Sequence, residues 1–407
     1  MPNTSMSDTP LFAALEPRAP DAIIALMEQA KADPNPDKID LGVGVYKNTD
    51  GDTPIMRAVL GAEKRWLEEE DTKLYMGTVG DADFRGALLD LVLGDDHPAL
   101  AGGRIASSQA AGGSGALRMG AELIVSAYPD ATVWHSDPTW ANHTPLIGSA
   151  GLAMKPYPYY SRETLGVRFD AMMDTLRNEA KAGDVVLLHG CCHNPTGADL
   201  SDAEWDQVAA LMAERGLLPF IDLAYMGLGR GLREDAYGLL KCLELCPEVV
   251  FTVSCSKNFA LYRERVGLVG IACADADTAK TVQGHLGAIQ RTLISMPPAW
   301  GARVVATVLG DRDLRHSWNE ELTEMRTRIR RLRRALADEL SVQGGEGLAN
   351  AVRDQQGMFS TLPIGREGAE AIRKSHSVYI TNSGRMNIAA ANLDNIPRLA
   401  KALLEAL

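Results

Sequence analysis

The sequence predicts an α/β protein in which a mostly parallel β-sheet is covered by helices on both faces. One repeated pattern in the sequence leads to this prediction. Six short apolar runs between about residues 100 and 275 alternate with helical patterns: RIASSQA, ATVWHS, DVVLLHG, LPFIDLA, VVFTVSC and VGLVGIACA. Strands separated by helices in this way indicate crossover connections, which make neighbouring strands parallel and bury both faces of the sheet.

The two ends of the chain differ from this central part. An extended segment, KIDLGVGVY, lies near the start, and VYITNSGRMNIAA lies near the end. We therefore expect a smaller α/β domain built from both termini. The division that follows assigns residues 1–52 to an N-terminal arm and the first segment of the small domain, 53–317 to the large domain, and 318–407 to a long connecting helix and the rest of the small domain.

The connecting helix is predicted from its apolar periodicity. Apolar residues recur at spacings of three and four and form one buried stripe: Leu322, Met325, Ile329, Leu332, Leu336 and Leu340. The arginines of TRIRRLRR are then assigned to the solvent-exposed face of this helix, with nucleic-acid binding as a weaker alternative.

Composition excludes several classes of protein. A chain of 407 residues with 46% hydrophobic and 23% charged residues is typical of a globular protein, and the net charge of -12 argues against nucleic acid as a partner. The sequence has no run of eighteen apolar residues and no secretion signal, so we expect neither membrane insertion nor export. The adjacent Cys191 and Cys192 suit a reducing, cytoplasmic compartment. Cys242 and Cys246 have no further ligands nearby, so no metal site is expected.

Polar residues follow most of the predicted strands, at the sheet edge where open α/β proteins bind ligands. The glycines of AAGGSGALR can present backbone N–H groups to a phosphate as a helix begins. This segment fits neither the dinucleotide-binding nor the Walker pattern. The other strand ends offer a flat ring, an amide, a carboxylate, a phenol and an amine, from Trp140, Asn194, Asp222, Tyr225 and Lys257.

Each of these residues alone has an ordinary explanation: a surface lysine, a core tryptophan, a turn at Asn194. Asp222 is harder to explain, because a carboxylate in an apolar strand is costly unless a cation or strong donor pairs with it. Together with Ser254 and Arg265, the set matches pyridoxal 5'-phosphate, which has a phosphate, a flat ring, a pyridinium nitrogen, a phenolic oxygen and an aldehyde that reacts with lysine.

Five motifs carry a resemblance to a known family: S-x-S-K-N-F-x-x-Y-x-E-R-x-G, HNPTG, D-x-A-Y, GG-[ST]-GALR and S-G-R-[IMV]-N. Together they resemble the class I, fold-type I aminotransferases of the aspartate and aromatic amino acid group, from about residue 11 to the C-terminus. The resemblance implies the fold-type I architecture, pyridoxal 5'-phosphate as cofactor, and a homodimer with shared active sites.

The resemblance also implies a role for each residue that acts on the cofactor. Lys257 would hold the cofactor covalently and shuttle a proton between it and the substrate α-carbon. Asp222 would keep the pyridinium nitrogen protonated. Tyr225 and Asn194 would hold the phenolic oxygen, while Trp140 would stack on the ring. The phosphate would be bound by small polar groups and one cation: Gly113, Ser114, Ser254, Ser256 and Arg265, joined by Tyr75 from the other subunit.

The remaining implied roles concern the substrate and the support of Asp222. Arg385 would clamp the α-carboxylate, assisted by Gly44 and Asn194, because a planar carboxylate fits a guanidinium fork. Arg291 would reach into the other subunit's site and bind the distal carboxylate of a dicarboxylic substrate. His143 and His189 would support Asp222 from behind.

Some segments depart from the family's wording, namely YMGTVG, TWANH, AYMGL and Met296. They lie where the substrate side chain is expected, so the preferred amino donor stays open. The expected function is transfer of the α-amino group of an aromatic or dicarboxylic amino acid (aspartate, tyrosine, phenylalanine) to 2-oxoglutarate, with ping-pong kinetics through pyridoxamine phosphate. A lyase or decarboxylase on the same cofactor, and a non-catalytic relative of the fold, are the alternatives.

Overall fold

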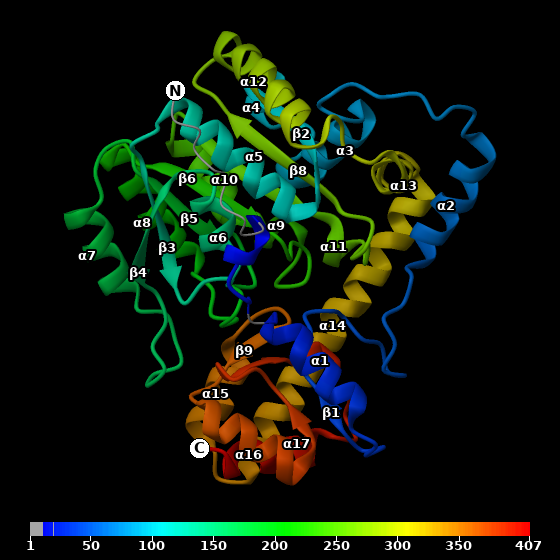
Figure 1. Cartoon of the computed structure of the whole chain (residues 1–407), viewed down its shortest axis with the longest axis vertical. Helices are drawn as coiled ribbons and strands as arrows, with labels where there is room; N and C mark the ends of the chain where they lie inside the picture. Colours follow the sequence, from blue (N-terminus) through cyan, green and yellow to red (C-terminus); the bar gives the residue numbers. More distant parts are fainter. Residues whose placement is uncertain (1–10, 19) are drawn as a thin grey trace, which may run out of the picture.

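The computed structural model describes residues 11–18 and 20–407, so residues 1–10 and Ala19 of the predicted N-terminal arm lie outside the described residues. A seven-stranded sheet forms the upper part of the molecule in Figure 1. Its strands are β2 (Ile105–Ala111), β3 (Thr132–Asp137), β4 (Ala153–Pro158), β5 (Val185–His189), β6 (Leu218–Leu223), β7 (Val249–Ser254) and β8 (Val266–Ala272). Their order across the sheet is β2-β8-β7-β6-β5-β3-β4.

The six predicted strands are confirmed as β2, β3 and β5 to β8. The strands from β3 to β7 are parallel, whereas β8 runs antiparallel to both β2 and β7. Residues 255–265 connect β7 to β8, and a parallel crossover needs about a dozen residues or more. The expectation of crossovers between all six strands was therefore wrong for β8, although the sheet is mostly parallel as predicted.

Strand β4 was not predicted. It contains Pro156 and Pro158, which cannot donate to the hydrogen-bonded ladder, and it lies at the edge of the sheet. Proline is tolerated at an edge because one side of the strand needs no partner. The sequence AMKPYP therefore lacked the apolar pattern of a central strand.

Helices cover both faces of the sheet because alternate residues of a buried strand point in opposite directions. In β5, Val185 and Leu187 belong to an apolar core that includes residues of α5, α6 and α12. Val186 and Leu188 belong to the larger core on the other face. The helices of the chain are η1 (Leu11–Ala14), α1 (Ala22–Ala32), α2 (Arg57–Glu69), α3 (Ala82–Leu93), α4 (Pro98–Ala101), α5 (Gly112–Ala127), α6 (His143–Gly148), α7 (Phe169–Glu179), α8 (Asp202–Arg215), α9 (Leu232–Asp235), α10 (Tyr237–Leu245), α11 (Cys255–Asn258), α12 (Ala276–Ile294), α13 (Ala299–Gly310), α14 (Arg312–Val342), α15 (Glu346–Asp354), α16 (Arg366–His376), η2 (Ile388–Ala390) and α17 (Ile396–Glu405).

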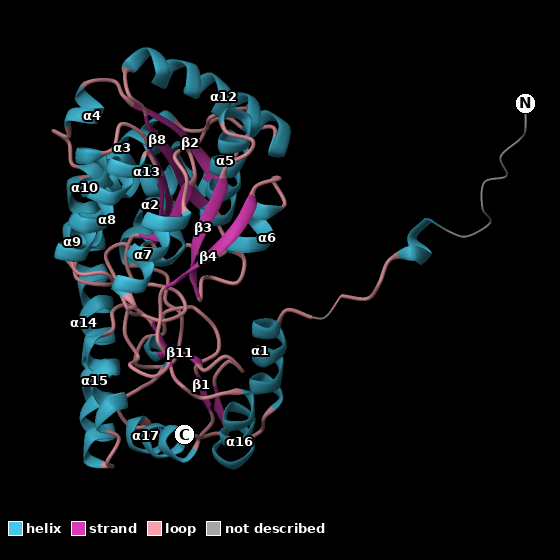
Figure 2. Ribbon diagram, turned by 90° about the vertical axis from the view of Figure 1, so that its left-hand side faces the viewer, coloured by secondary structure: helices cyan, strands magenta, loops and turns pink. Residues whose placement is uncertain are grey.

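Segments from both ends of the chain meet in the lower part of the molecule (Figures 1 and 2). β1 (Ile39–Asp40) pairs in parallel with β10 (Val378–Tyr379), and β9 (Phe359–Thr361) pairs antiparallel with β11 (Arg385–Asn387). The long helix α14 runs from the sheet into this lower part without interruption. The division predicted after residue 317 falls inside α14, and the domain boundaries remain a proposal.

The apolar stripe predicted for α14 is confirmed, since all six of its residues are buried. The assignment of the arginines to the solvent-exposed face was wrong for Arg333, which is 3% exposed. Its guanidinium donates to backbone carbonyls and one hydroxyl, so burial leaves it with hydrogen-bond partners. Within residues 11–18 and 20–407, no helix is long and apolar enough to cross a membrane.

Candidate active site

The loops that follow β2, β3, β5, β6 and β7 converge on a cavity of about 300 Å³. The cavity is lined by Ile23, Gly44, Gly113, Ser114, Leu117, Trp140, His189, Asn194, Asp222, Ala224, Tyr225, Ser254, Ser256, Lys257, Tyr262, Arg265, Phe359 and Arg385. Every residue predicted to bind cofactor or substrate lines this cavity except Tyr75 and Arg291. The carboxyl ends of parallel strands thus bring together groups that are far apart in the sequence, as the sheet topology requires.

One end of the cavity is a concave arrangement of anion-binding groups. Helix α5 begins at Gly112, whose φ of 69° is one that residues with a Cβ rarely adopt. A side chain at Gly112 would overlap the Arg265 guanidinium, and one at Gly113 would come within 3.2 Å of Ser254. Arg265 Nη1 donates to Ser256 Oγ at 3.2 Å. A helix N-terminus, two hydroxyls and a guanidinium around space kept free by glycines suit a phosphate group.

Lys257 lies on the single-turn helix α11, with its Nζ 4.8 Å from the centre of the Tyr225 ring. Burial lowers the pKa of Lys257 to about 8, with Arg265 acting in the same direction and Asp222 opposing it. An amine with this pKa is neutral in a much larger fraction of molecules near pH 7 than an ordinary lysine. Lys257 is therefore suited to act as a nucleophile and as a base.

Asp222 is buried at the end of β6 and holds a negative charge there. Its Oδ1 accepts a hydrogen bond from Thr252 Oγ1 at 2.9 Å, and its Oδ2 lies 3.3 Å from His143 Nε2. Burial acts to raise the pKa of Asp222, but the hydrogen bonds from His143 and Thr252 act against burial, and the pKa lies below its ordinary value. An ionised carboxylate in an apolar setting is complementary to a protonated ring nitrogen.

A chain of hydrogen bonds behind Asp222 fixes the orientation of two imidazoles. The Asn194 backbone N–H donates to His189 Nδ1 at 3.4 Å. Burial lowers the pKa of His189 to about 3, so the ring is neutral and its proton is on Nε2. That group donates to Thr139 Oγ1 at 3.2 Å, and the Thr139 hydroxyl donates to His143 Nδ1 at 2.8 Å. His143 Nε2 is thereby left with a proton that points at Asp222.

His143 thus lies directly beside Asp222. His189 is connected to the Asp222 carboxylate through Thr139 and His143. Thr139, which stands next to Trp140 in DPTWANH, was not predicted from the sequence. A hydroxyl at a predicted strand end, directly before the selected Trp140, was the signal that could have found it.

Arg385 provides a second guanidinium in the cavity, besides that of Arg265. It is buried on β11, where Nη2 donates to Gly42 O at 2.8 Å and Nη1 lies 3.5 Å from Asn194 Oδ1. Among the described residues its Nε has no hydrogen-bond partner. The guanidinium carbon lies 4.6 Å from the centre of the Phe359 ring, which the sequence analysis also missed. Buried donors that are free or weakly engaged suit a carboxylate.

Tyr75 and Arg291 do not line the cavity of this chain. Tyr75 is 90% exposed, and Arg291 contacts Ser295 Oγ near the exposed end of α12. Both were predicted to act in the site of another subunit, and the geometry of a single chain leaves that prediction untested.

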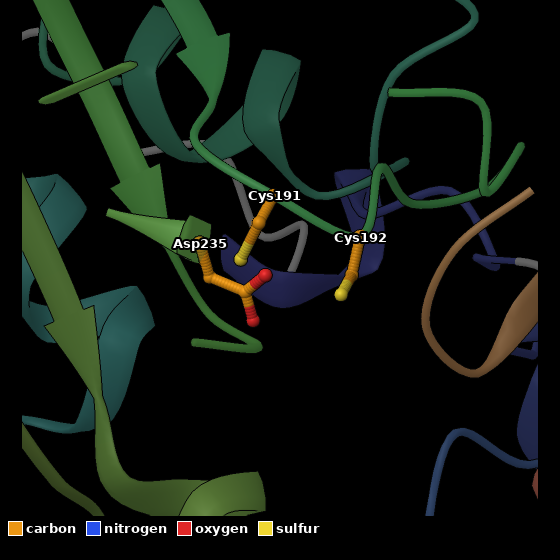
Figure 3. Close-up of side chains that lie close together, drawn as sticks. All are labelled: Cys191, Cys192 and Asp235. Carbon is orange, nitrogen blue, oxygen red and sulfur yellow. The ribbon is translucent and has the colours of Figure 1, made fainter. Parts of the chain in front are cut away.

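Two neighbouring thiols and a carboxylate lie close together beside the loops of the site (Figure 3). Ligand atoms of Cys191, Cys192 and Asp235 are all within 4.8 Å of one another, and all three residues are buried. The Asp235 carboxylate accepts hydrogen bonds from three backbone N–H groups of residues 227–230. The hydrogen bond with Cys191 acts to lower the pKa of Cys192, but burial and the nearby carboxylates raise it to about 11, which keeps the thiol protonated. The Asp235 carboxylate, through its three hydrogen bonds, stabilises the turn that follows Tyr225.

Comparison with known proteins agrees with this geometry. The family model described as aminotransferase class I and II matches residues 36–403. The chain is 46% identical over 395 residues to an aromatic-amino-acid aminotransferase of Paracoccus denitrificans, covering 97% of this chain and 99% of that one. It is 40% identical over 397 residues to an aspartate aminotransferase of Escherichia coli, covering 98% and 100%.

A solved structure is similar over nearly the whole chain. The crystal structure of an aromatic-amino-acid aminotransferase from Burkholderia pseudomallei, covalently bound to pyridoxal phosphate, superposes with a TM-score of 0.95 at 40% identity, covering 98% of this chain and 100% of that one. The cradle at α5, the ionised Asp222 and the low-pKa Lys257 fit the same cofactor in this chain. The chain thus belongs to the class I and II aminotransferases, and it is an aminotransferase that depends on pyridoxal phosphate.

Proposed function

We propose that the enzyme transfers the α-amino group of an aromatic or dicarboxylic amino acid (aspartate, tyrosine, phenylalanine) to 2-oxoglutarate by a ping-pong mechanism. The observation that carries the proposal is the buried Arg385, which lines the same cavity as Lys257 and whose Nη1 is only weakly engaged, at 3.5 Å from Asn194 Oδ1. A reactive amine and a fork for a carboxylate in one cavity suit an α-amino acid. Relatives named for aromatic amino acids and for aspartate support both substrate classes.

Each group of the site has a defined role in this proposal. Lys257 binds the cofactor covalently and moves the proton at the substrate α-carbon, while Asp222 holds the ring nitrogen protonated. Asn194 and Tyr225 hold the phenolic oxygen, and Trp140 covers the ring. When bound, the cofactor supplies a ring that withdraws the electrons left at the α-carbon. The phosphate is held by Gly113, Ser114, Ser254, Ser256 and Arg265, with Tyr75 of a second copy.

All these substrates share an α-carboxylate, which Arg385, Gly44 and Asn194 bind. Two other surfaces determine which side chains are accepted. Apolar side chains in the cavity, including Leu117, can contact an aromatic ring. Arg291 of a second copy binds the distal carboxylate of aspartate or 2-oxoglutarate. We propose accordingly that the active form is a homodimer, with a large domain at 53–317 and a small domain from 1–52 and 318–407.

The experiment that tests this choice is Arg291→Ala, measured in the half-reactions with aspartate and with phenylalanine. Losing a charge-assisted contact should lower kcat/KM for aspartate roughly 10- to 100-fold, with little change for phenylalanine. Arg312→Ala is the matched control, because its side chain is 96% exposed and should affect neither substrate. Equal losses for both substrates, or none for aspartate, would reopen the substrate class.

The alternatives left open by the sequence are a lyase or decarboxylase and a non-catalytic relative. The relatives described above are aminotransferases, which supports neither alternative. Assays with and without 2-oxoglutarate separate them, because only a transaminase needs an oxo-acid acceptor for turnover.

A further inference from the structure

Arg333 is a buried cation outside the cavity that the proposed mechanism does not use. It lies on α14, and its side chain is almost entirely removed from solvent. Burial lowers the pKa of Arg333 to about 10, which still leaves the guanidinium charged near neutral pH. Burying a charge is costly, and hydrogen bonds must offset that cost. The presence of a charge here therefore calls for a specific role.

All hydrogen bonds of the Arg333 guanidinium go to one short segment, residues 352–360. Nε donates to Gly357 O at 3.0 Å, and Nη1 donates to Val352 O at 3.2 Å and to Ser360 Oγ at 2.9 Å. Nη2 donates to the carbonyl oxygens of residues 356 and 359. The fork of donors is rigid and planar, so these contacts fix the path of the segment relative to α14.

The segment held in this way carries one wall of the α-carboxylate site. Phe359 begins β9, and its ring lies under the Arg385 guanidinium at 4.6 Å. β9 pairs with β11, with Phe359 opposite Asn387 and Thr361 opposite Arg385. Arg333 binds the Phe359 carbonyl oxygen. The position of Arg385 therefore depends on a strand whose first peptide is held by Arg333.

This segment, together with Thr361 directly after it, contacts the loop that carries Asn194. The Gln356 backbone N–H donates to Gly197 O at 2.7 Å, and Thr361 Oγ1 donates to Pro195 O at 2.8 Å. The two segments of backbone pass so closely that a side chain at Gly197 would overlap the Phe359 carbonyl oxygen. Arg385 and Asn194, which lie on different parts of the fold, are thus brought to within 3.5 Å by contacts on either side of one segment.

We propose that Arg333 is a positioning residue for the α-carboxylate site, which it shapes by holding residues 352–360 between Arg385 and Asn194. The inference rests on the proposed role of Arg385 in binding the α-carboxylate. It assigns to Arg333 no contact with substrate or cofactor. Loss of Arg333 should therefore weaken binding of any ligand through its α-carboxylate and leave ligands without that group unaffected.

The test uses the holoenzyme and 3-phenylpropanoate, an analogue of phenylalanine that lacks the reactive amine. Its Kd is measured by titration calorimetry for the wild type and for Arg333→Met, which removes all five hydrogen bonds. Displacement of a binding group by about 1 Å can cost up to 100-fold, so we expect Kd to rise about 10- to 100-fold. Arg333→Lys keeps the charge and up to three donors and should show a smaller rise.

A second readout distinguishes positioning from a general loss of structure. The half-reaction of phenylalanine should slow in Arg333→Met, whereas that of 2-phenylethylamine, which has no carboxylate, should stay within about twofold of the wild-type rate. Leu336→Ala, a buried change on the same face of α14, is the control for lost stability and should leave the Kd of 3-phenylpropanoate unchanged. If Arg333→Met fails to fold, Ser360→Ala and Arg333→Lys should each still raise Kd severalfold.

The Kd of 3-phenylpropanoate is also measured for Arg385→Ala. This variant separates failure of the proposed role of Arg385 from failure of positioning by Arg333. An unchanged Kd in Arg385→Ala would refute the proposed role of Arg385 itself. A weakened Kd in Arg385→Ala, with an unchanged Kd in the Arg333 and Ser360 variants, would refute positioning by Arg333 alone. An equal rise in Kd for Leu336→Ala, or an equal slowing with 2-phenylethylamine, would also overturn the proposal, because the effect would then be general.

Discussion

Replacing Lys257 by methionine should make the cofactor-free protein more stable at neutral pH. The pKa of Lys257 is about 8 in the folded chain, against an ordinary value of 10.5, because burial disfavours the ammonium. One pKa unit corresponds to about 1.4 kcal/mol, so keeping the charged form buried at pH 7 costs on the order of 3 kcal/mol. Methionine removes the charge at similar volume and should recover up to that amount.

The sign of the pH dependence follows from the same shift. Between pH 8 and 10.5 the unfolded chain binds more protons at Lys257 than the folded chain, so the stability of the wild type rises with pH in this range. The advantage of Lys257→Met should therefore be complete below pH 8 and shrink by roughly 1 kcal/mol between pH 7 and pH 9.

The assay is urea unfolding of the two cofactor-free proteins at pH 7 and pH 9, at equal protein concentration. Lys280→Met is the matched control, because Lys280 is exposed on α12 and its replacement should change stability by less than about 0.5 kcal/mol. A methionine variant no more stable than the wild type at pH 7, or an advantage that does not change with pH, would refute a buried, low-pKa amine at this position.

Two further changes test the groups behind the ring nitrogen. Asp222→Asn keeps the size of the side chain and removes its charge, so we expect the proton-transfer step in single turnovers to slow by several orders of magnitude. The rise in the barrier should exceed the ~1.5 to 3 kcal/mol of one charged hydrogen bond. An unaltered rate would rule out contact between Asp222 and the ring nitrogen. Thr139→Val removes the hydroxyl between His189 and His143, so it should lower the free energy of unfolding by roughly 1 to 3 kcal/mol and weaken cofactor binding. Thr139→Ser keeps the hydroxyl and should retain both stability and cofactor affinity. Equal behaviour of the two variants would contradict the hydrogen-bond chain.

The strand-end residues could be predicted from sequence because their chemistry is unusual for their position. A carboxylate inside the apolar run LPFIDLA requires a strong partner wherever the strand lies, and parallel strands deliver their carboxyl ends to one edge. Trp140, Asn194, Asp222 and Lys257 were therefore placed together before their distances were known. The small domain built from both ends of the chain was predicted from two extended segments, one near each terminus.

The features that the sequence could not reveal depend on contacts between distant segments. Thr139 looks like any strand-end threonine until two imidazoles are found on either side of its hydroxyl. Phe359 and Arg333 lie outside the motifs, and an arginine in a charged helical run is usually exposed. Burial of Arg333 becomes favourable only when a loop offers several carbonyl oxygens at once, which helical periodicity does not encode. The reversal of β8 likewise reflects the length of its connection and not its apolar pattern.

The central claim is that Lys257 is the lysine to which the cofactor is attached. Borohydride reduction of the holoenzyme makes such a link permanent, and peptide mapping by mass spectrometry then locates it. We expect the mass of the reduced cofactor on the peptide that contains Lys257 and on no other. Reduced cofactor on a different lysine, or no covalent adduct in holoenzyme that is active, would contradict the assignment of the site.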